Sequence, residues 1–471
     1  MSDDLKRRVD RILSGRPVAP PEIPATAQAG WWSRLKQKIT GRGRPREKDG
    51  LRIHLASEAP PPAKPSRRAF VWAVVFAALA TAALFFSLIL YRAWVAPVRL
   101  RPALAASWPT YARLFATPAW TRQQQILSLD TEGRFFGLDL ASGHRIFEVS
   151  VGSPGLAPVL LADLRGQGVE DAVLALADGS VSAFRSDGVR LWKTPGAARL
   201  SRFLAKPVFH KVDGEGRVLV VDESGQVFCL ESAYGHVIWS RLDSPLLRGD
   251  VFATPLFWGD RWILAGRSGQ VVALDARDGR TLWSSSNDQP IRASPLSIPE
   301  GVLLIDEKGR ALVFRKNGEI VSRAELKHPV VSSPAALDGG RWAVGTADGK
   351  ILVARSPGAK LDFEISAADQ EGFLAPLVAV DLNGDGVMDL VALTGDGRLY
   401  LVNVRRQRLF CDPLAAADGA TAQPLVGVVA ERPAALVASE SGSLRLYALL
   451  ADPDRAIGSH PSARQFLDRA P

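Results

Sequence analysis

The stretch GQVVALDARDGRTLWS, residues 269–284, places two glycines ten residues apart, with a short apolar run after the first. A short apolar run bounded by turn residues predicts a buried strand, and glycine beside polar residues predicts a tight turn. The segment RTLWS follows the second glycine and predicts another strand. The stretch therefore predicts a β-hairpin with turns at Gly269 and Gly279.

This hairpin recurs along the chain, as GRFFGLDLASG (133–143), GSVSAFRSDG (179–188), GQVFCLESAYG (225–235) and GRLYLVNVRRQ (397–407). The first-turn glycines of successive units lie 40 to 48 residues apart, at positions 133, 179, 225, 269, 309, 349, 397 and 442. A proline precedes each of them by 14 to 21 residues, at positions 118, 158, 207, 255, 295, 334, 376 and 424. The chain therefore contains eight related units.

Each unit holds four short strands, and a lone antiparallel sheet of this size cannot bury its own faces. Sheets stacked radially into a ring do bury them, which is the β-propeller. We expect an all-β, eight-bladed propeller over residues 118–450, with seven blades and one degenerate unit as the alternative. The last unit lacks a fourth strand. The segment 92–117 is expected to be a linker whose part from about residue 98 supplies the strand that closes the ring.

Trp192, Trp239 and Trp283 each stand four residues after a second-turn glycine. An aromatic cage for a ligand is one interpretation of these side chains. Large rings that fill the gap between neighbouring sheets are the favoured one, because a propeller needs such a ring at one repeated position. The alignment of the other units places Phe147, Ser322, Asp362 and Cys411 at this position.

The repeat GQVVALDARDGRTLWS resembles that of pyrroloquinoline-quinone-type propellers, which include quinoprotein dehydrogenases and the propeller lipoprotein of the outer-membrane β-barrel assembly machinery. The resemblance implies the fold and leaves the function open, because enzymes and scaffolds share the repeat. An enzyme of this family would need a vicinal cysteine pair, a stacking tryptophan, a calcium site in the channel and an Asp base. Cys229 and Cys411 fall in the third and seventh units, so we expect no catalysis and no quinone.

The stretch DLNGDGVMDLV, residues 381–391, carries oxygen ligands at alternating positions around two glycines. Such spacing suits the six or seven oxygen ligands of Ca²⁺. The predicted ligands are Asp381, Asn383, Asp385, Asp389 and the backbone carbonyl of Val387. The loop resembles the calcium hairpins of FG-GAP propellers, and a strand follows it rather than the helix of an EF-hand. An acidic glycine turn without metal is the alternative.

The second unit offers an internal comparison for the calcium loop. The stretch DLRGQGVEDAVL, residues 163–174, has the same pattern of glycines. Arg165 and Gln167 stand where the calcium loop has Asn383 and Asp385. We therefore expect no metal there.

Residues 69–91 form an uncharged, apolar run of 23 positions, long enough to cross a bilayer as a helix. Residues 1–68 hold 16 Lys and Arg against 7 Asp and Glu, and the rest of the chain holds 42 of each. The basic side is expected to face the cytoplasm, which places the propeller outside. We therefore predict a signal anchor in a bacterial inner membrane with a periplasmic propeller. The body has no basic stripe, so we expect no nucleic acid.

Two amphipathic segments lie within the otherwise disordered tail predicted for residues 1–68. They are open to three interpretations: binding to the membrane surface, binding to a cytoplasmic partner, or no function beyond fixing the topology. Residues 451–471 are predicted to form a C-terminal tail. The whole pattern favours a non-catalytic envelope scaffold that binds a protein complex. A ligand-binding sensor or transporter-associated module is the alternative, and a quinone-dependent dehydrogenase is a weaker one.

Overall fold

The computed structural model describes residues 100–110, 112–194, 201–242, 246–247, 249–356, 358–420, 422–429 and 432–451. It also describes five helical residues between 75 and 87, namely Val75, Leu79, Thr81, Ala83 and Ser87. The chain divides into two units, residues 1–83 and 84–471. The predicted basic tail, the C-terminal tail and nearly all of the predicted span 69–91 lie outside the described residues. Within the described residues, no helix has both the length and the apolar character needed to cross a membrane.

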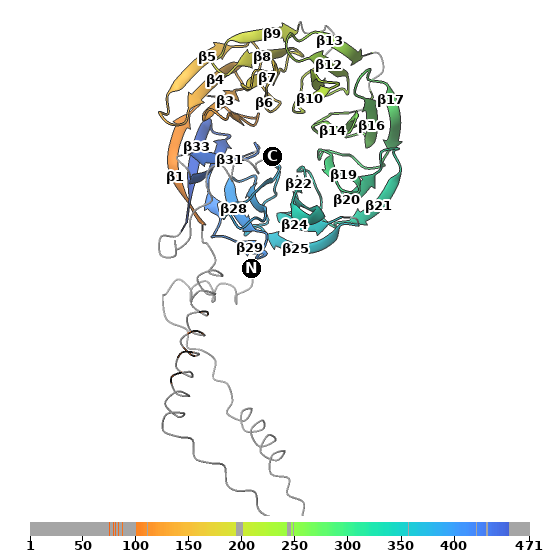
Figure 1. Ribbon diagram of the computed structural model, residues 1–471. Coiled ribbons are helices and arrows are strands. Elements are labelled where there is room, and N and C mark those ends of the chain that lie inside the picture. Colours follow the sequence, from red (N-terminus) through yellow and green to blue (C-terminus); the bar gives the residue numbers. More distant parts are fainter. Residues whose placement is uncertain are drawn as a thin grey trace, which may run out of the picture. The chain divides into compact units, whose positions relative to one another are not determined.

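Eight sheets arranged around a centre form the second unit (Figure 1). The strands of blades 1 to 3 are β2 (Ala119–Trp120), β3 (Gln125–Leu129), β4 (Arg134–Asp139), β5 (Arg145–Ser150), β6 (Leu160–Ala162), β7 (Asp171–Ala175), β8 (Val181–Arg185), β9 (Arg190–Thr194), β10 (Val208–Val212), β11 (Glu215–Val221), β12 (Val227–Glu231) and β13 (Val237–Arg241). Those of blades 4 and 5 are β14 (Leu256–Trp258), β15 (Arg261–Ala265), β16 (Gln270–Asp275), β17 (Thr281–Ser286), β18 (Leu296–Ile298), β19 (Gly301–Ile305), β20 (Arg310–Phe314) and β21 (Ile320–Glu325).

The remaining strands form blades 6 to 8. They are β22 (Ala335–Ala336), β23 (Arg341–Gly345), β24 (Lys350–Arg355), β25 (Lys360–Ser366), β26 (Val378–Val380), β27 (Asp389–Leu393), β28 (Arg398–Asn403), β29 (Arg408–Leu409), β30 (Leu414–Ala415), β31 (Leu425–Val429), β32 (Arg432–Ser439), β33 (Ser443–Ala451) and β1 (Leu100–Pro109). A single 3₁₀ turn, η1 (Asp338–Gly340), joins β22 to β23. In blade 7 the outermost strand is split, so that both β29 and β30 pair with β28.

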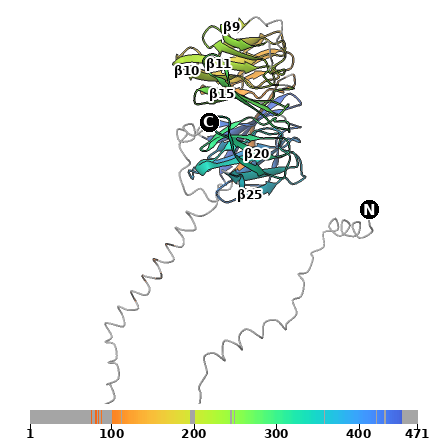
Figure 2. The same cartoon turned by 90° about the vertical axis from the view of Figure 1, so that its right-hand side faces the viewer.

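Each blade is an antiparallel meander whose first strand lies at the centre of the ring and whose fourth lies at the circumference. The first strands of neighbouring blades contact one another around the centre. Loops from first to second strands lie on one side of the ring, which we call the entry face because β1 begins there at Leu100. The connections from one blade to the next lie on the opposite side, which we call the channel face. Figure 2 shows the blades from the edge of the ring.

The ring is closed by β1, which pairs with β33 as the fourth strand of blade 8. Leu100 lies opposite Ala451 and Pro109 opposite Ser443, with one irregularity in register between Leu104 and Ala106. The prediction of eight blades, closed by a strand from the segment before residue 118, is therefore confirmed.

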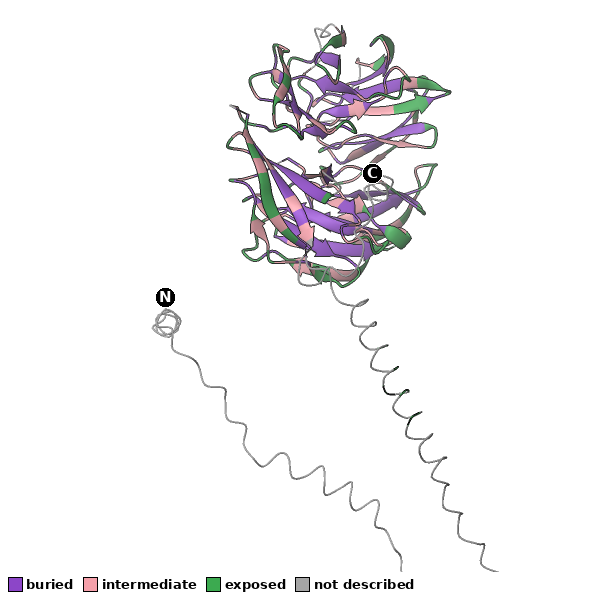
Figure 3. Ribbon diagram, turned by 60° about the vertical axis from the view of Figure 1, so that its left-hand side comes forward, coloured by how far each residue is buried: buried purple, intermediate pink, exposed green. Residues whose placement is uncertain are grey.

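The hydrophobic core consists of eight clusters, and each lies between two neighbouring blades. The second and third strands of blades 1 to 7 are almost wholly buried, while the fourth strands consist mainly of intermediate and exposed residues (Figure 3). One cluster joins Leu436 of blade 8 to Ile126 of blade 1, so the contact between last and first blades resembles the other seven. Burial between sheets is the main stabilising contribution in such a ring.

The three repeated tryptophans pack between blades, which confirms the favoured interpretation. Each indole lies against the second-turn glycine of the following blade, so Trp192, Trp239 and Trp283 contact Gly235, Gly279 and Gly318. Each indole N–H also donates to a backbone carbonyl of that blade, at 2.9, 3.3 and 3.0 Å. Phe147 packs in the same way on Gly188.

One predicted equivalence in this set is wrong. In blade 4, Trp283 lies opposite Ala273 on the neighbouring strand, just before a register shift. The residue in that place in blade 6 is Phe363, opposite Val353, and not Asp362. The aromatic position therefore extends further around the ring than the alignment of the units indicated.

Candidate functional site

The loop between β26 and β27 in blade 7 holds the predicted calcium ligands on the entry face. Asp381 accepts hydrogen bonds from the backbone amides of Gly384 and Gly386, both at 2.8 Å. Gly384 and Gly386 have φ values of +72° and +82°, the left-handed region that glycine adopts without strain. The Asp385 carboxylate accepts the amide of Val387 at 2.9 Å. The loop is thus wound tightly around its own carboxylates.

Asp389 ends this loop and is completely buried at the start of β27. Its carboxylate accepts the backbone amides of Leu382 and Val404, both at 3.2 Å. Burial, together with the negative charges of Asp385 and Asp381, raises the pKa of Asp389 to about 8. Within the described residues no lysine or arginine forms an ion pair with it. Burying an ionised carboxylate costs free energy unless a positive charge compensates it.

The equivalent loop of blade 2 has that positive charge. Asp163 accepts the amides of Gln167 and Gly168 at 2.8 Å, so the backbone follows the same turn. The buried Asp171 occupies the place of Asp389, and Arg165 binds it through two hydrogen bonds of 3.0 and 2.9 Å. Arg165 stands where blade 7 has Asn383. One loop therefore carries its own cation, and the other presents acidic oxygens in its place.

These groups fit a hard cation such as Ca²⁺, which binds carboxylate, amide and backbone oxygens. The structure brings Asp381, Asp385 and Asp389 into one loop, close enough for the first two to influence the third. In the part of the chain that the structure describes, no three His, Cys, Asp or Glu side chains stand together in metal-ligating geometry. The loop carboxylates instead accept backbone amides, and Arg405 lies 3.7 Å from Asp385. A cation would exchange some of these contacts for metal–oxygen bonds.

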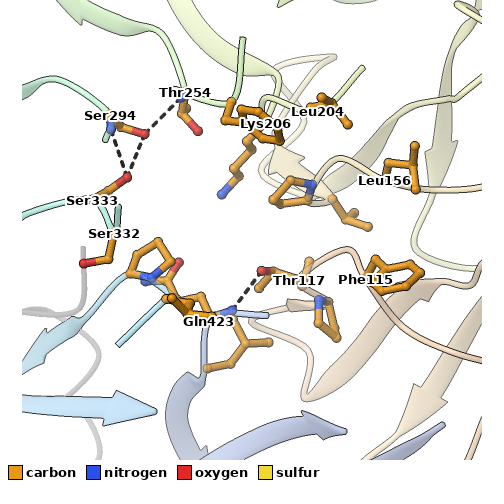
Figure 4. A pocket seen from close by; sticks show the side chains of 18 of the residues that line it. Phe115, Thr117, Leu156, Leu204, Lys206, Thr254, Ser294, Ser332, Ser333 and Gln423 are labelled. Atoms are coloured by element: carbon orange, nitrogen blue, oxygen red, sulfur yellow. Dashed lines mark hydrogen bonds between the residues drawn. The ribbon is translucent and has the colours of Figure 1, made fainter. Parts of the chain in front are cut away.

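A second site, not predicted from the sequence, is a cavity of about 650 Å³ in the central channel (Figure 4). One repeated position lines it, two residues before the first strand of each blade. This position is occupied by Thr117, Pro158, Lys206, Thr254, Ser294, Ser333, Pro376 and Gln423. Every blade thus contributes one residue to the wall of the cavity.

Hydrogen bonds between blades fix part of this wall. The amide of Thr254 donates to the Ser294 hydroxyl at 2.9 Å, and the amide of Ser294 donates to the Ser333 hydroxyl at 2.9 Å. The amide of Gln423 likewise donates to the Thr117 hydroxyl at 3.2 Å. These serine and threonine side chains are occupied in positioning neighbouring blades, which argues for a preformed cavity.

The residues one step further out form a mostly apolar rim, which consists of Phe115, Leu156, Leu204, Phe252, Arg292, Val331 and Leu374. Phe115 and Leu374 are 42% and 46% exposed, so the cavity is open to solvent at the rim. An apolar wall with few polar groups is the usual composition of a binding site.

Three charged side chains line the cavity. Glu170 accepts the backbone amide of Arg122 at 2.8 Å and lies 3.6 Å from its guanidinium. The Arg292 guanidinium lies over the Phe252 ring at 4.5 Å. The amine of Lys206 points into the cavity (Figure 4), and no described residue forms an ion pair with it. Burial lowers the pKa of Lys206.

These residues do not fit the quinone apparatus of an enzyme. Cys229 lies in β12 of blade 3, and Cys411 lies in blade 7, so the chain has no vicinal pair; both thiols are free. The cavity wall offers Glu170 as its one carboxylate, and this group is already held by Arg122.

Comparisons with known proteins agree with this fold. A family model described as outer membrane protein assembly factor BamB matches residues 177–329, from the second blade to the end of the fifth. No curated protein matches the chain.

Solved structures extend the likeness over the ring. BamB from Moraxella catarrhalis is 17% identical over 74% of this chain and 100% of its own, with a TM-score of 0.57. Sqt1 from Saccharomyces cerevisiae is 13% identical over 76% and 100%, with a TM-score of 0.57. A europium-containing methanol dehydrogenase is 12% identical over 75% and 94%, with a TM-score of 0.57. At these identities the structures establish the fold alone. The predicted resemblance to pyrroloquinoline-quinone-type propellers is confirmed: this chain is an eight-bladed propeller whose residues 177–329 match the repeat of the BamB model.

Proposed function

We propose that this protein is a non-catalytic scaffold, anchored in a bacterial inner membrane, whose propeller binds a protein complex of the cell envelope. The apolar span 69–91 and the basic residues before it support the anchor and its orientation. The match of residues 177–329 to a BamB model supports a propeller that binds proteins.

The observation that carries this proposal is the composition of the channel. Apart from Glu170, Lys206, Arg292 and Gln423, its wall is made of small hydroxyl side chains, prolines and apolar groups, and three of the hydroxyls accept hydrogen bonds from neighbouring blades. A nucleophile needs a base within hydrogen-bonding reach, and Lys206 faces no such partner among the described residues. The wall suits binding better than chemistry.

We also propose that Ca²⁺ binds the blade 7 loop through Asp381, Asn383, Asp385, Asp389 and the Val387 carbonyl. The supporting observation is Asp389, a buried carboxylate whose counterpart in blade 2 is neutralised by Arg165. Its role is structural, because none of the proposed calcium ligands lines the cavity.

Crosslinking of the full-length protein in its native membrane, followed by identification of the captured proteins, tests the scaffold. A reproducible envelope complex is expected. Quinone-dependent dye reduction by the purified full-length protein would instead establish an enzyme.

The cavity favours a second candidate function, because its volume of about 650 Å³ lies in the range of small-molecule sites. A saturable small ligand, with no protein captured, would establish the sensor or transporter-associated module.

A further inference from the structure

The central cavity carries a lysine, Lys206, with which no described residue forms an ion pair. Lys206 stands just before β10, at the position that is Ser or Thr in four other blades. Three of those hydroxyls, those of Thr117, Ser294 and Ser333, accept backbone amides of neighbouring blades, whereas the lysine amine extends into the cavity (Figure 4). A lysine in a wall of apolar and hydroxyl groups is less stable as a cation than in water. The fold itself gives no structural reason for a charge here.

The other charged groups of the wall do not neutralise the positive charge of Lys206. Glu170 is bound by Arg122, and Arg292 adds a second positive charge at the rim. The cavity therefore has an excess of positive charge. A carboxylate is the group that would restore the balance, since an ammonium ion and a carboxylate form a charge-assisted hydrogen bond.

The rim determines what can surround that carboxylate. Phe115 and Leu374 present large apolar surfaces to solvent, and Leu204 and Phe252 continue this surface around the opening. Exposed apolar surface around a polar centre is typical of protein-binding sites. An occupant should bring apolar side chains to the rim and a carboxylate to Lys206.

We propose that the cavity binds a segment of a partner protein that inserts an Asp or Glu side chain, flanked by apolar residues, toward Lys206; this rests on the scaffold function proposed above. The segment approaches the cavity from the channel face, on the side of the ring opposite the calcium loop. A volume of about 650 Å³ accommodates a few side chains and not a folded domain, so the occupant is a loop or a chain end.

Site-specific photocrosslinking of the full-length protein in its native membrane tests where the partner binds. Benzoylphenylalanine is placed at Phe115 or Leu374 on the rim, and at Val237 or Leu361 on the circumference, which are 51% and 43% exposed. A partner captured at the rim is expected. Capture at the circumference alone would overturn the cavity proposal while leaving the scaffold function intact, and capture at none of the four positions would count against both.

Charge variants test the chemistry at the rim. Lys206→Glu should lower the rim crosslink about tenfold or more, and Lys206→Arg should retain it. Lys211→Glu is the matched control, because Lys211 lies in the same blade and is exposed. Equal crosslinking by the Lys206→Glu and Lys211→Glu proteins would overturn the proposal. Thermal melting verifies that each variant is folded.

A defined probe separates a peptide from a small ligand. The capped peptides FLDLF and FLNLF are titrated into the full-length protein in detergent. The Asp peptide should bind about tenfold more tightly than the Asn peptide, and Lys206→Met should abolish the difference. Equal affinities would contradict the proposal, as would hexanoate binding as tightly as the Asp peptide.

Discussion

Arg165 binds the buried carboxylate of Asp171 through two hydrogen bonds, of 3.0 and 2.9 Å, at a place where blade 7 has Asn383 beside Asp389. The two loops share the same glycine positions and the same turn. They differ in where the positive charge comes from, a side chain in one and a proposed metal ion in the other. This pair of loops allows each to serve as the control for the other.

Calcium should bind blade 7 and stabilise the fold. Calorimetry of the full-length protein is expected to show one saturable calcium site, and Asp385→Ala should abolish its heat. At a calcium concentration 100 times the dissociation constant, binding should add about 2.7 kcal/mol to the free energy of unfolding. Equal heats from the native and variant proteins would remove the site.

Asn383→Arg should convert the blade 7 loop into the type found in blade 2. The new guanidinium is expected to pair with Asp389, and the metal-free protein should gain about 1–3 kcal/mol of stability. Calcium should then bind no longer. Thermal melting with and without a chelator measures both effects. A variant that still gains stability from calcium would show that Arg165 and the metal are not equivalent.

Arg165→Asn should leave Asp171 buried without a cation and lower the free energy of unfolding by about 3–5 kcal/mol. The exposed pair of Arg185 and Asp187 provides the control, since both side chains are nearly half exposed. Arg185→Gln should cost less than about 1 kcal/mol. Denaturant unfolding compares the two, and similar losses would mean that the buried pair contributes no more than a surface pair.

Gly279→Ala should destabilise the ring by more than Gly259→Ala. Both glycines have φ near +70°, and both substitutions place a side chain in the left-handed region, at about 1–2 kcal/mol. A methyl group at Gly279 would also lie 2.4 Å from the indole of Trp239, whereas nothing lies within 4 Å of one at Gly259. Overpacking should add about 1–3 kcal/mol. Melting temperatures provide the measurement; equal shifts would contradict tight packing of the indole.

Cys229 should make the stability depend on alkaline pH. Burial raises the pKa of its thiol to about 12, above the value of about 8.5 in an unfolded chain. The folded protein therefore binds this proton more tightly. The contribution of the buried thiol to the free energy of unfolding is complete below about pH 8.5 and falls by about 1.4 kcal/mol per pH unit above that pH. The stability difference between the native protein and Cys229→Ala should narrow by that amount between pH 9 and 10. Cys411→Ala is the control, because Cys411 is only partly buried; parallel profiles for the native and Cys229→Ala proteins would exclude this role for burial.

The ring could be predicted because a glycine marks the turn between the second and third strands of every blade. The pairing register of the fourth strands, at the circumference, could not be predicted. Phe363, and not Asp362, occupies the aromatic position of blade 6, since the second-turn glycine comes one residue earlier there: Gly358 lies nine residues after Gly349, whereas Gly279 lies ten after Gly269. A bulge follows that position in both blades, and counting from the glycine does not reveal such a shift.

The two candidate sites differ in the same respect, since one could be predicted from the sequence and the other could not. The calcium loop is local, so all of its proposed ligands lie within nine residues and the pattern is visible in the sequence. The cavity is built from one residue per blade, and its residues lie up to about 300 positions apart. The sequence showed that Arg165 replaces a predicted calcium ligand, but its bond to Asp171 could be found only from the structure. The repeat did contain a signal for Lys206, the one basic residue at its position among the eight units.

Closure by β1 has a consequence for synthesis. A ribosome makes Leu100–Pro109 first among the strands and the partner strand Ser443–Ala451 last. Throughout translation, β1 remains an unpaired strand edge, which is the kind of edge that invites wrong pairing. Contacts between such distant residues also form slowly. The nascent chain must therefore keep its first strand available until its last strand emerges, and a chain that stops before residue 443 leaves the ring open.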